Sequence, residues 1–205
     1  MKVLVACEFS GIVREAFAAR GHVAWSCDLL PTEQQGNHYQ GDVRDILDDG
    51  WDLLIAHPPC TYLSAAGARW LYGGGAIDLE RLEKGMEARY FFMELLNVDI
   101  PRIAVENPRQ MKIFKLPQFS QEIQPYQFGE SYSKATRLWL KGLPRLEPTE
   151  VCDDYSPLLP SNTGTGKRKG YKSHKGHIRQ HNKKGAYEAS RTFRGIAAAM
   201  AEQWG

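Results

Sequence analysis

The stretch "KVLVACEFSGIVREAFAARGHVAWSCD", residues 2–28, decides the fold that we expect for this chain. It opens with an apolar run over 2–7 that is typical of a buried strand, and a turn of small residues around Gly11 follows. Apolar side chains then recur at helical spacing up to Gly21, and a second strand ends at Asp28. A strand, a helix and a second strand in this order predict a right-handed βαβ unit with parallel strands.

The same alternation continues along the chain. "LLIA" (53–56) is apolar without interruption, as a parallel strand buried on both faces requires. Residues 78–97 predict an amphipathic helix with Asp78 as its N-cap. "PRIAVENP" (101–108) and "TRLWLKGLP" (136–144) predict two further strands. We therefore predict an α/β fold of the Rossmann-like type, a mostly parallel sheet with flanking helices and room for antiparallel strands at its end.

The composition is that of a soluble globular protein, because 42% of the 205 residues are hydrophobic and 24% are charged. No apolar run approaches the roughly 20 residues of a membrane span. The run that follows Met1 and Lys2 is too short for a signal peptide. The four cysteines are far apart and form no C-x-x-C pair, which favours a reducing cytoplasm over a disulfide framework. We therefore expect a cytoplasmic protein without a membrane segment.

The character of the chain changes after Pro144, where Pro, Gly and small polar residues become frequent. We expect 1–145 to form the catalytic core and 146–187 to form an extended insertion or arm. We expect 188–205 to form a last helix, from about Arg191, that packs back on the core.

One basic tract lies within this arm. Between Lys167 and Lys184 there are eight Lys or Arg and no acid, so the tract carries +8 in a chain of net charge +2, and the remainder carries −6. Such a tract is typical of a contact with nucleic-acid phosphates, and a solvated loop is the alternative. Its histidines have no nearby cysteine and no clear helix, so we predict no metal site. The predicted nucleic-acid-binding residues are Lys167, Arg168, Lys169, Lys172, Lys175, Arg179, Lys183 and Lys184.

The turn "CEFSG" (7–11) is typical of a nucleotide-cofactor site, because backbone N–H groups and a helix N-terminus face a ligand there. The G-x-G-x-x-G pattern is absent, and with Gly11 alone a cofactor without phosphates fits better than a dinucleotide. Asp28 is placed to accept hydrogen bonds from ribose hydroxyls, and Asp42 to bind an exocyclic amine; solvated acids are the alternative for both. Together these residues favour S-adenosylmethionine over NAD. The predicted cofactor-binding residues are Glu8, Phe9, Ser10, Gly11, Asp28, Leu29, Asp42, Val43 and Pro58.

A thiol and a carboxyl group follow two of the predicted strands. In "IAHPPC" (55–60) the two prolines end the strand, so Cys60 lies on the loop at its carboxyl end, and "AVENP" places Glu106 at the end of another strand. A thiolate that attacks carbon 6 of a pyrimidine, with an acid that protonates nitrogen 3, makes carbon 5 nucleophilic. A buried, inert cysteine and a salt-bridged glutamate are the alternatives.

In these motifs the sequence resembles the DNA cytosine-5 methyltransferase family, in order through residues 1–145 and again in the last helix. "EFSG", "GDV", "PPC", "EN" and "SYSKATRLWL" carry the resemblance. It implies a methyltransferase fold that binds S-adenosylmethionine, with Cys60 as nucleophile and Glu106 as proton donor. It also implies that Asn107 holds the catalytic loop and that Arg137 holds the base or the glutamate. The chain is similar to small, phage-like members: the usual target-recognition domain is missing unless residues 146–187 replace it, and "PCT" and "ENP" replace "PCQ" and "ENV".

We therefore predict an enzyme that transfers a methyl group from S-adenosylmethionine to carbon 5 of cytosine in DNA through a covalent Cys60 adduct, with no obligate protein partner. Two alternatives remain open. "HPPC" also resembles the N-P-P-Y motif of enzymes that methylate exocyclic amines, although Cys60 stands where an aromatic residue is usual. The other alternative is a non-catalytic relative that binds nucleic acid through the basic tract.

Residues 62–77, "YLSAAGARWLYGGGAI", follow the candidate nucleophile directly. The glycines at 73–75 predict a hinge, and Trp70 with Tyr72 would cover a base extruded from a duplex. A flexible connector is the alternative.

Overall fold

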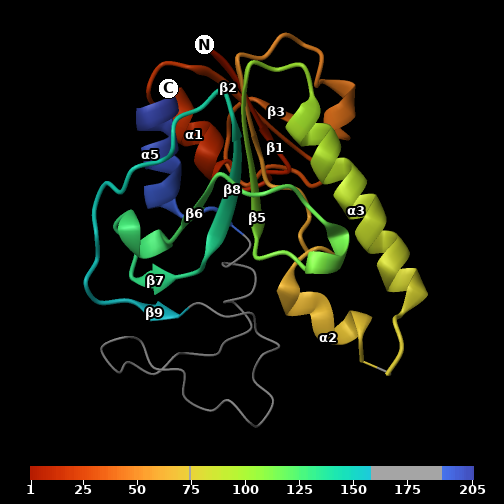
Figure 1. The fold of residues 1–205 in the computed structure, drawn as a ribbon. Helices are drawn as coiled ribbons and strands as arrows, with labels where there is room; N and C mark the ends of the chain where they lie inside the picture. The colour runs from red at the N-terminus through yellow and green to blue at the C-terminus, as the bar shows by residue number, and fades with distance from the viewer. Residues whose placement is uncertain (74, 158–190) are drawn as a thin grey trace.

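A computed structural model describes residues 1–73, 75–157 and 191–205 (Figure 1). Within these residues the centre of the fold is a seven-stranded sheet with the strand order β3-β2-β1-β4-β5-β8-β6. A separate two-stranded sheet pairs β7 (Tyr132–Ser133) with β9 (Ser156–Pro157). The strands of the large sheet are β1 (Lys2–Ala6), β2 (Val23–Asp28), β3 (His38–Gln40), β4 (Leu53–Ala56), β5 (Arg102–Pro108), β6 (Gln121–Ile123) and β8 (Thr136–Lys141).

The strands β1 to β5 are parallel, whereas β8 runs antiparallel to both β5 and β6. The chain leaves β1 toward β2 and β3 on one side, and returns to the other side of β1 through β4 and β5. Such a reversal is a topological switch point, and in open α/β sheets the crevice at the carboxyl ends of the strands beside it holds the ligand. The mostly parallel, Rossmann-like α/β fold predicted from the sequence is therefore confirmed.

Helices cover both faces of this sheet. The helices α1 (Ile12–Ala18) and α5 (Arg194–Trp204) lie on one face, and α3 (Leu79–Asn97) lies on the other (Figure 1). Alternate residues of each strand face the two sides; in β4, Leu53 and Ile55 join the core under α1 and α5, and Leu54 joins the core under α3. Four short 3-10 helices are described: η1 (Val43–Asp45), η2 (Ala65–Gly67), η3 (Lys112–Phe114) and η4 (Pro125–Gln127).

The helix α3 begins as predicted, because the side chain of Asp78 accepts a hydrogen bond from the backbone N–H of Arg81 (2.9 Å). No described helix is both long and apolar enough to cross a membrane. The short elements β3, β6 and α2 (Ala68–Leu71) were not predicted from the sequence.

The last helix starts at Arg194, three residues later than predicted. Its first turn lies directly on the backbone of Phe128, where a Cβ at Gly195 would come within 1.7 Å of the Phe128 carbonyl oxygen. The N–H of Gly195 donates to a carboxylate oxygen of Glu130 (3.2 Å). This close contact fixes where the helix begins.

The described part of the predicted arm, residues 146–157, lies against the body of the protein. Leu146 is fully buried in the core under α1 and α5, and its backbone exchanges hydrogen bonds with the side chain of Gln121 (2.6 and 2.8 Å). Tyr155 stacks on Tyr126 with a centroid distance of 4.0 Å. Residues 158–187 of the arm lie outside the described residues.

Candidate active site

The candidate acid and an unpredicted histidine meet at the carboxyl edge of the sheet. Ile55 pairs with Ala104 and Ala56 with Val105 in neighbouring parallel strands, so His57 and Glu106 fall in the next row. Both side chains lie on the face of the sheet that α1 and α5 cover. The Nδ1 atom of His57 is 3.6 Å from Oε2 of Glu106, a separation longer than an ordinary hydrogen bond.

The surroundings of Glu106 favour its ionised form. Burial acts to raise the pKa of this carboxyl group, but His57 and the positive charge of Lys134 outweigh burial and hold the pKa below its ordinary value. The Glu106 side chain keeps about 20% of its surface exposed, so it remains within reach of a ligand.

Cys60 is half-buried and interacts electrostatically with Glu106 and Lys134. Burial and the negative charge of Glu106 raise the pKa of the Cys60 thiol, whereas the charge of Lys134 acts to lower it. The carbonyl oxygen of Cys60 accepts hydrogen bonds from the N–H groups of Leu63 (3.1 Å) and Ser64 (2.8 Å), which fold the chain into a turn just after the thiol. The nucleophile and the acid predicted from the sequence therefore lie in one electrostatic environment.

Asn107 and Arg137 lie on the opposite face of the sheet from Glu106. They are paired in the register of β5 and β8, so their side chains share the face that α3 covers. Asn107 is fully buried and donates from Nδ2 to the carbonyl oxygen of Pro108 (2.6 Å); its Oδ1 atom has no hydrogen-bond partner among the described residues.

Arg137 is engaged by other side chains. Its guanidinium donates to carboxylate Oε2 of Glu122 (3.0 Å) and to Oε1 of Gln110 (2.7 Å), and it lies 4.3 Å from the ring centroid of Phe119. The structure therefore does not bring Arg137 to Glu106.

A small cavity of about 30 Å³ adjoins His57 and Glu106 on the side of α5. The sequence predictions had not included His57, Lys134, Thr136 or the residues that precede α5. Signals for two of them were present: His57 opens the "HPPC" motif, and Lys134 lies within "SYSKATRLWL". The cavity is lined by His57, Glu106, Lys134, Thr136, Arg191, Thr192, Phe193, Ile196 and Met200.

Glu8, in the predicted cofactor turn, is buried and caps the start of α1. Its carboxylate accepts hydrogen bonds from the backbone N–H groups of Val13 (2.7 Å) and Arg14 (3.2 Å), and from the hydroxyl group of Ser10 (3.2 Å). Gly11 has a φ of 71°, a left-handed conformation that favours glycine. An anion therefore already occupies the N-terminus of this helix.

The other predicted cofactor residues lie at the carboxyl ends of β1 to β4. Asp28 accepts a hydrogen bond from the N–H of Leu30 (2.9 Å), and Leu29 beside it is 73% exposed. Asp42 accepts from the N–H of Arg44 (3.0 Å) and also forms an ion pair with the guanidinium of this arginine (3.1 Å). Phe9 is partly buried, and Val43 and Pro58 are buried.

Cys7, at the end of β1, interacts electrostatically with both Asp28 and Asp42. Burial, followed by the negative charge of Asp28, raises the pKa of the Cys7 thiol to about 12, and the charges of Cys27 and Asp42 act in the same direction. Because the N–H of Gly41 donates to the carbonyl oxygen of Asp28 (3.0 Å), Asp28 and Asp42 lie together at the ends of β2 and β3.

Arg14 forms hydrogen bonds to the loop that follows Asp28. Its side chain is fully buried, and its guanidinium donates to acceptors on both sides of the loop. The acceptors are Oε1 of Glu15 (2.9 Å), the hydroxyl groups of Ser26 (3.0 Å) and Thr32 (3.2 Å), and the carbonyl oxygens of Gln34 (2.9 Å) and Gln35 (3.1 Å).

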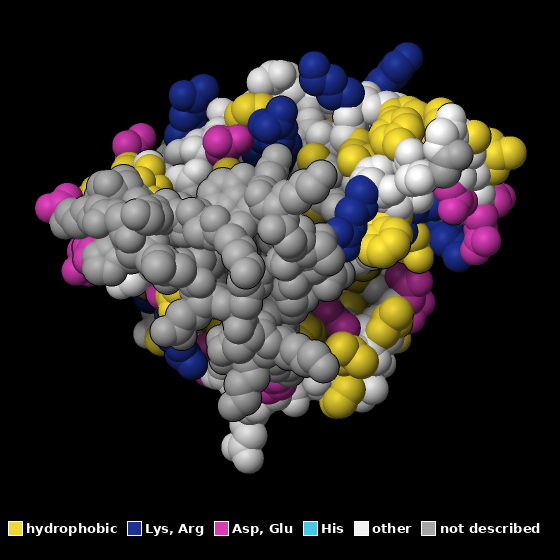
Figure 2. Space-filling view, turned by 90° about the horizontal axis from the view of Figure 1, so that it is seen from below, with side chains coloured by type: hydrophobic (Ala, Val, Ile, Leu, Met, Phe, Trp, Pro, Cys, Tyr) yellow, Lys and Arg dark blue, Asp and Glu magenta, His cyan; other side chains and the backbone are white. Residues whose placement is uncertain are grey.

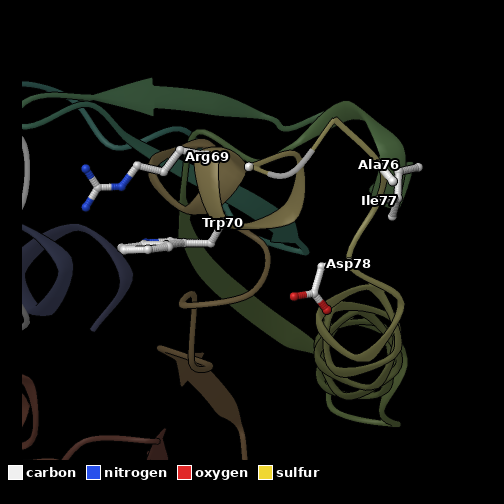
Figure 3. Close-up of a pocket in the computed structure, with 6 residues that line it drawn as sticks. Arg69, Trp70, Ala76, Ile77 and Asp78 are labelled. Carbon is white, nitrogen blue, oxygen red and sulfur yellow. The ribbon is translucent and has the colours of Figure 1, made fainter.

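A larger, open cleft of about 670 Å³ lies between α2 and the start of α3. The guanidinium of Arg69 is 4.5 Å from the ring centroid of Trp70, which is 55% exposed. Figure 3 shows these two side chains one above the other, both directed away from the segment that carries Ala76 and Ile77. Figure 2, which views the molecule from below, shows hydrophobic, basic and acidic side chains interspersed on the right of the picture.

The eight basic residues predicted to bind nucleic acid, from Lys167 to Lys184, lie outside the described residues. Within the part of the chain that the structure describes, no three His, Cys, Asp or Glu side chains form a group that could hold a metal ion.

No protein-family model and no curated protein matches the chain. Similar solved structures include a protein described as a DNA modification methyltransferase of an E. coli prophage, with 13% identity, a TM-score of 0.44, and coverage of 84% of this chain and 57% of that one. The Entamoeba histolytica methyltransferase EhMeth has 12% identity, a TM-score of 0.45, and coverage of 79% and 63%. The S. pombe Dnmt2 methyltransferase has 12% identity, a TM-score of 0.38, and coverage of 71% and 50%. The chain thus spans about half to three-fifths of the length of these proteins.

Proposed function

We propose that this protein transfers a methyl group from S-adenosylmethionine to carbon 5 of cytosine in DNA, with Cys60 as nucleophile and Glu106 as general acid. The observation that carries the proposal is the shared environment of these two side chains at the carboxyl edge of the sheet. Each of them interacts electrostatically with Lys134, and the charge of Glu106 acts on the thiol of Cys60. A thiol and a carboxyl group in one place match the chemistry that a pyrimidine ring requires.

In the proposed reaction the sulfur of Cys60, as thiolate, forms a bond to carbon 6 of the ring. The electron pair of the bond between carbons 5 and 6 moves to carbon 5 as the Glu106 carboxyl group gives its proton to nitrogen 3. S-adenosylmethionine supplies the methyl group that carbon 5 takes up. Loss of the carbon 5 proton to water, return of the nitrogen 3 proton to the Glu106 carboxylate and breakage of the sulfur–carbon bond then restore the thiolate, the carboxyl group and the aromatic ring.

The residues at the ends of β1 to β3 fit a cofactor of this kind. Glu8 already fills the N-terminus of α1 with a carboxylate, so a pyrophosphate would meet repulsion there. S-adenosylmethionine has no phosphate, and its positively charged sulfonium suits a pocket edged by acids. In the proposed complex Asp28 accepts hydrogen bonds from the ribose hydroxyls, the exposed Leu29 covers the adenine, and Asp42 binds the adenine amine.

DNA is the proposed substrate, and two features support it. The basic tract from Lys167 to Lys184 has the charge that phosphate contacts require. Trp70, exposed beside Arg69 on the segment that follows Cys60, offers a face on which a base can stack.

The proposal is tested by incubating the protein with methyl-labelled S-adenosylmethionine and unmodified DNA, and then identifying the labelled nucleoside after digestion. We expect label in 5-methylcytosine, and its loss in the Cys60→Ser and Glu106→Gln variants. Cys152→Ser, which changes another half-buried thiol, serves as the control and should keep its activity. Label in an N-methylated base with Cys60→Ser still active would instead support amine methylation. DNA binding without any label would support a non-catalytic binding protein.

A further inference from the structure

His57 has a buried polar atom that the proposed mechanism leaves without a role. Its Nδ1 atom faces Glu106 at 3.6 Å, and its side chain is only 13% exposed. Its Nε2 atom is buried and has no hydrogen-bond partner among the described residues. Burying an unsatisfied ring nitrogen costs about 1–3 kcal/mol, so His57 occupies this position at a cost to stability.

The placement of His57 follows from the sheet and is well fixed. Its backbone N–H donates to the carbonyl oxygen of Ala6 (3.0 Å), which extends the pairing of β4 with β1 by one residue. Pro58 and Pro59 restrict the chain immediately afterward. The imidazole is thus held in the row beside Glu106, on the same face of the sheet.

The proposed reaction creates a specific need at Glu106. A general acid must hold a proton when the base arrives, yet Lys134 and His57 favour the carboxylate. Imidazole is the side chain that ordinarily exchanges a proton near neutral pH, so His57, 3.6 Å from the carboxylate, is placed to supply the proton that Glu106 lacks.

We propose that His57 is a positioning residue that shares one proton with Glu106 and returns it to the carboxyl group when the base binds. This inference rests on the proposed function, and it adds a residue that acts through the general acid. The proton moves from Nδ1 of His57 to Oε2 of Glu106, the Nδ1–H bond breaks and the O–H bond forms, and the net charge of the pair remains zero. The carboxyl group then passes its proton to nitrogen 3 of the cytosine.

The same transfer also affects the nucleophile. The negative charge of Glu106 raises the pKa of the Cys60 thiol, so neutralising Glu106 removes this contribution and favours the thiolate while Lys134 remains charged. One proton movement therefore prepares both reacting groups.

The groups around the pair come from several elements. Lys134 comes from the segment between β7 and β8, and Arg191, which precedes α5, is paired with the carboxylate of Glu33 (2.6 Å). Cys60 follows β4 and is the third titratable group. Thr136, Thr192, Phe193, Ile196 and Met200 complete the lining and do not titrate in the range of the test.

The pairing is tested first without any reaction, by NMR titration of the histidine ring signals in the full chain. The signal of His57 is identified by its absence in His57→Gln. We expect Glu106→Gln to move the titration of the His57 ring signals to lower pH, because it removes the carboxylate 3.6 Å from Nδ1. Glu80→Gln, which removes an exposed carboxylate that pairs with Lys84, should leave that titration unchanged. A His57 titration that is the same in wild type and Glu106→Gln overturns the proposal.

The role of the pair is tested by tritium release from carbon 5 of labelled cytosine in DNA, without any methyl donor. We expect the ratio of the His57→Gln rate to the wild-type rate to fall about tenfold between pH 5.5 and pH 7, because Glu106 must then take its proton from water. The ratio removes the dependence on the Cys60 thiolate, which both proteins share. His22→Gln, which changes a histidine beside Phe17 and far from Glu106, should give a constant ratio.

The outcomes separate this inference from the proposed function. A constant ratio for His57→Gln overturns the proton-sharing role even where the NMR coupling is present. If the wild type releases no tritium and methylates no base, the proposed function fails, while the NMR coupling still decides whether His57 and Glu106 share a proton.

Discussion

Arg14 offers the sharpest test of how the candidate cofactor site is built. It is fully buried, and within the described residues its guanidinium makes five hydrogen bonds of 2.9–3.2 Å. Arg14→Met keeps the length and apolar stem of the side chain but leaves these acceptors unpaired. Breaking a buried, charged network of this kind costs about 3–5 kcal/mol of the free energy of unfolding.

The assay is urea denaturation followed by circular dichroism. With a slope of about 3 kcal/mol per molar urea for a chain of this size, the midpoint of Arg14→Met should fall by about 1–1.7 M. Arg20→Met is the matched control, because Arg20 is 46% exposed and pairs with Glu202 at the surface (3.2 Å). We expect this control to cost no more than about 1 kcal/mol.

The reasoning is refuted if Arg14→Met lowers the midpoint no further than Arg20→Met does. A second readout connects the network to function. Arg14 holds the loop that follows Leu29 through hydrogen bonds to the carbonyl oxygens of Gln34 and Gln35. Arg14→Met should therefore also weaken binding of S-adenosylmethionine at temperatures where the variant is still folded.

Three further predictions concern thiol reactivity, packing and DNA binding. Glu106→Gln should accelerate alkylation of Cys60 by iodoacetamide at pH 7–8, because removing the negative charge lowers the pKa of the thiol and raises the thiolate fraction. Mass spectrometry of the labelled peptide measures the rate, and an unchanged rate would contradict this prediction. Gly195→Ala should lower the melting temperature by several degrees, at a cost of about 1–3 kcal/mol, because its Cβ would overlap the carbonyl oxygen of Phe128; a melting curve as in the wild type would disprove this contact. Trp70→Ala should weaken DNA binding about tenfold in a fluorescence titration at fixed salt, without changing affinity for S-adenosylmethionine, and equal DNA affinity would exclude a stacking role.

The regular part of the fold could be predicted because its strands carry a clear signal. The run that became β4 is apolar throughout, those in β1 and β5 have an apolar centre, and Asp78 marked the start of α3. The short strand β3 (His38–Gln40) is half-buried and polar, so no hydrophobic pattern marked it. Its position depends on pairing with β2, which is a tertiary contact.

The candidate site could be predicted at strand ends but not across the sheet. Cys60 and Glu106 were placed by the rule that the carboxyl ends of parallel strands share an edge. The face on which a side chain lies depends on the exact register, and the sequence did not indicate that Arg137 pairs opposite Asn107. Lys134 and the residues just before α5 reach the site through loops, whose course depends on tertiary packing rather than on local pattern.

Successive side chains of β5 lie on opposite faces of the sheet, which limits the insertions and deletions that the strand can accept. Glu106 faces the cavity beside α5, and Asn107 is buried beneath α3, although the two residues are neighbours in the chain. A single codon inserted into or deleted from this strand would exchange the two sides, so that a carboxylate would enter an apolar core and an amide would replace the acid. The strand pairs with β4 on one side and with β8 on the other, and both pairings fix its register. A change in the length of this strand would therefore disturb both of its faces at once, whereas a substitution changes a single side chain.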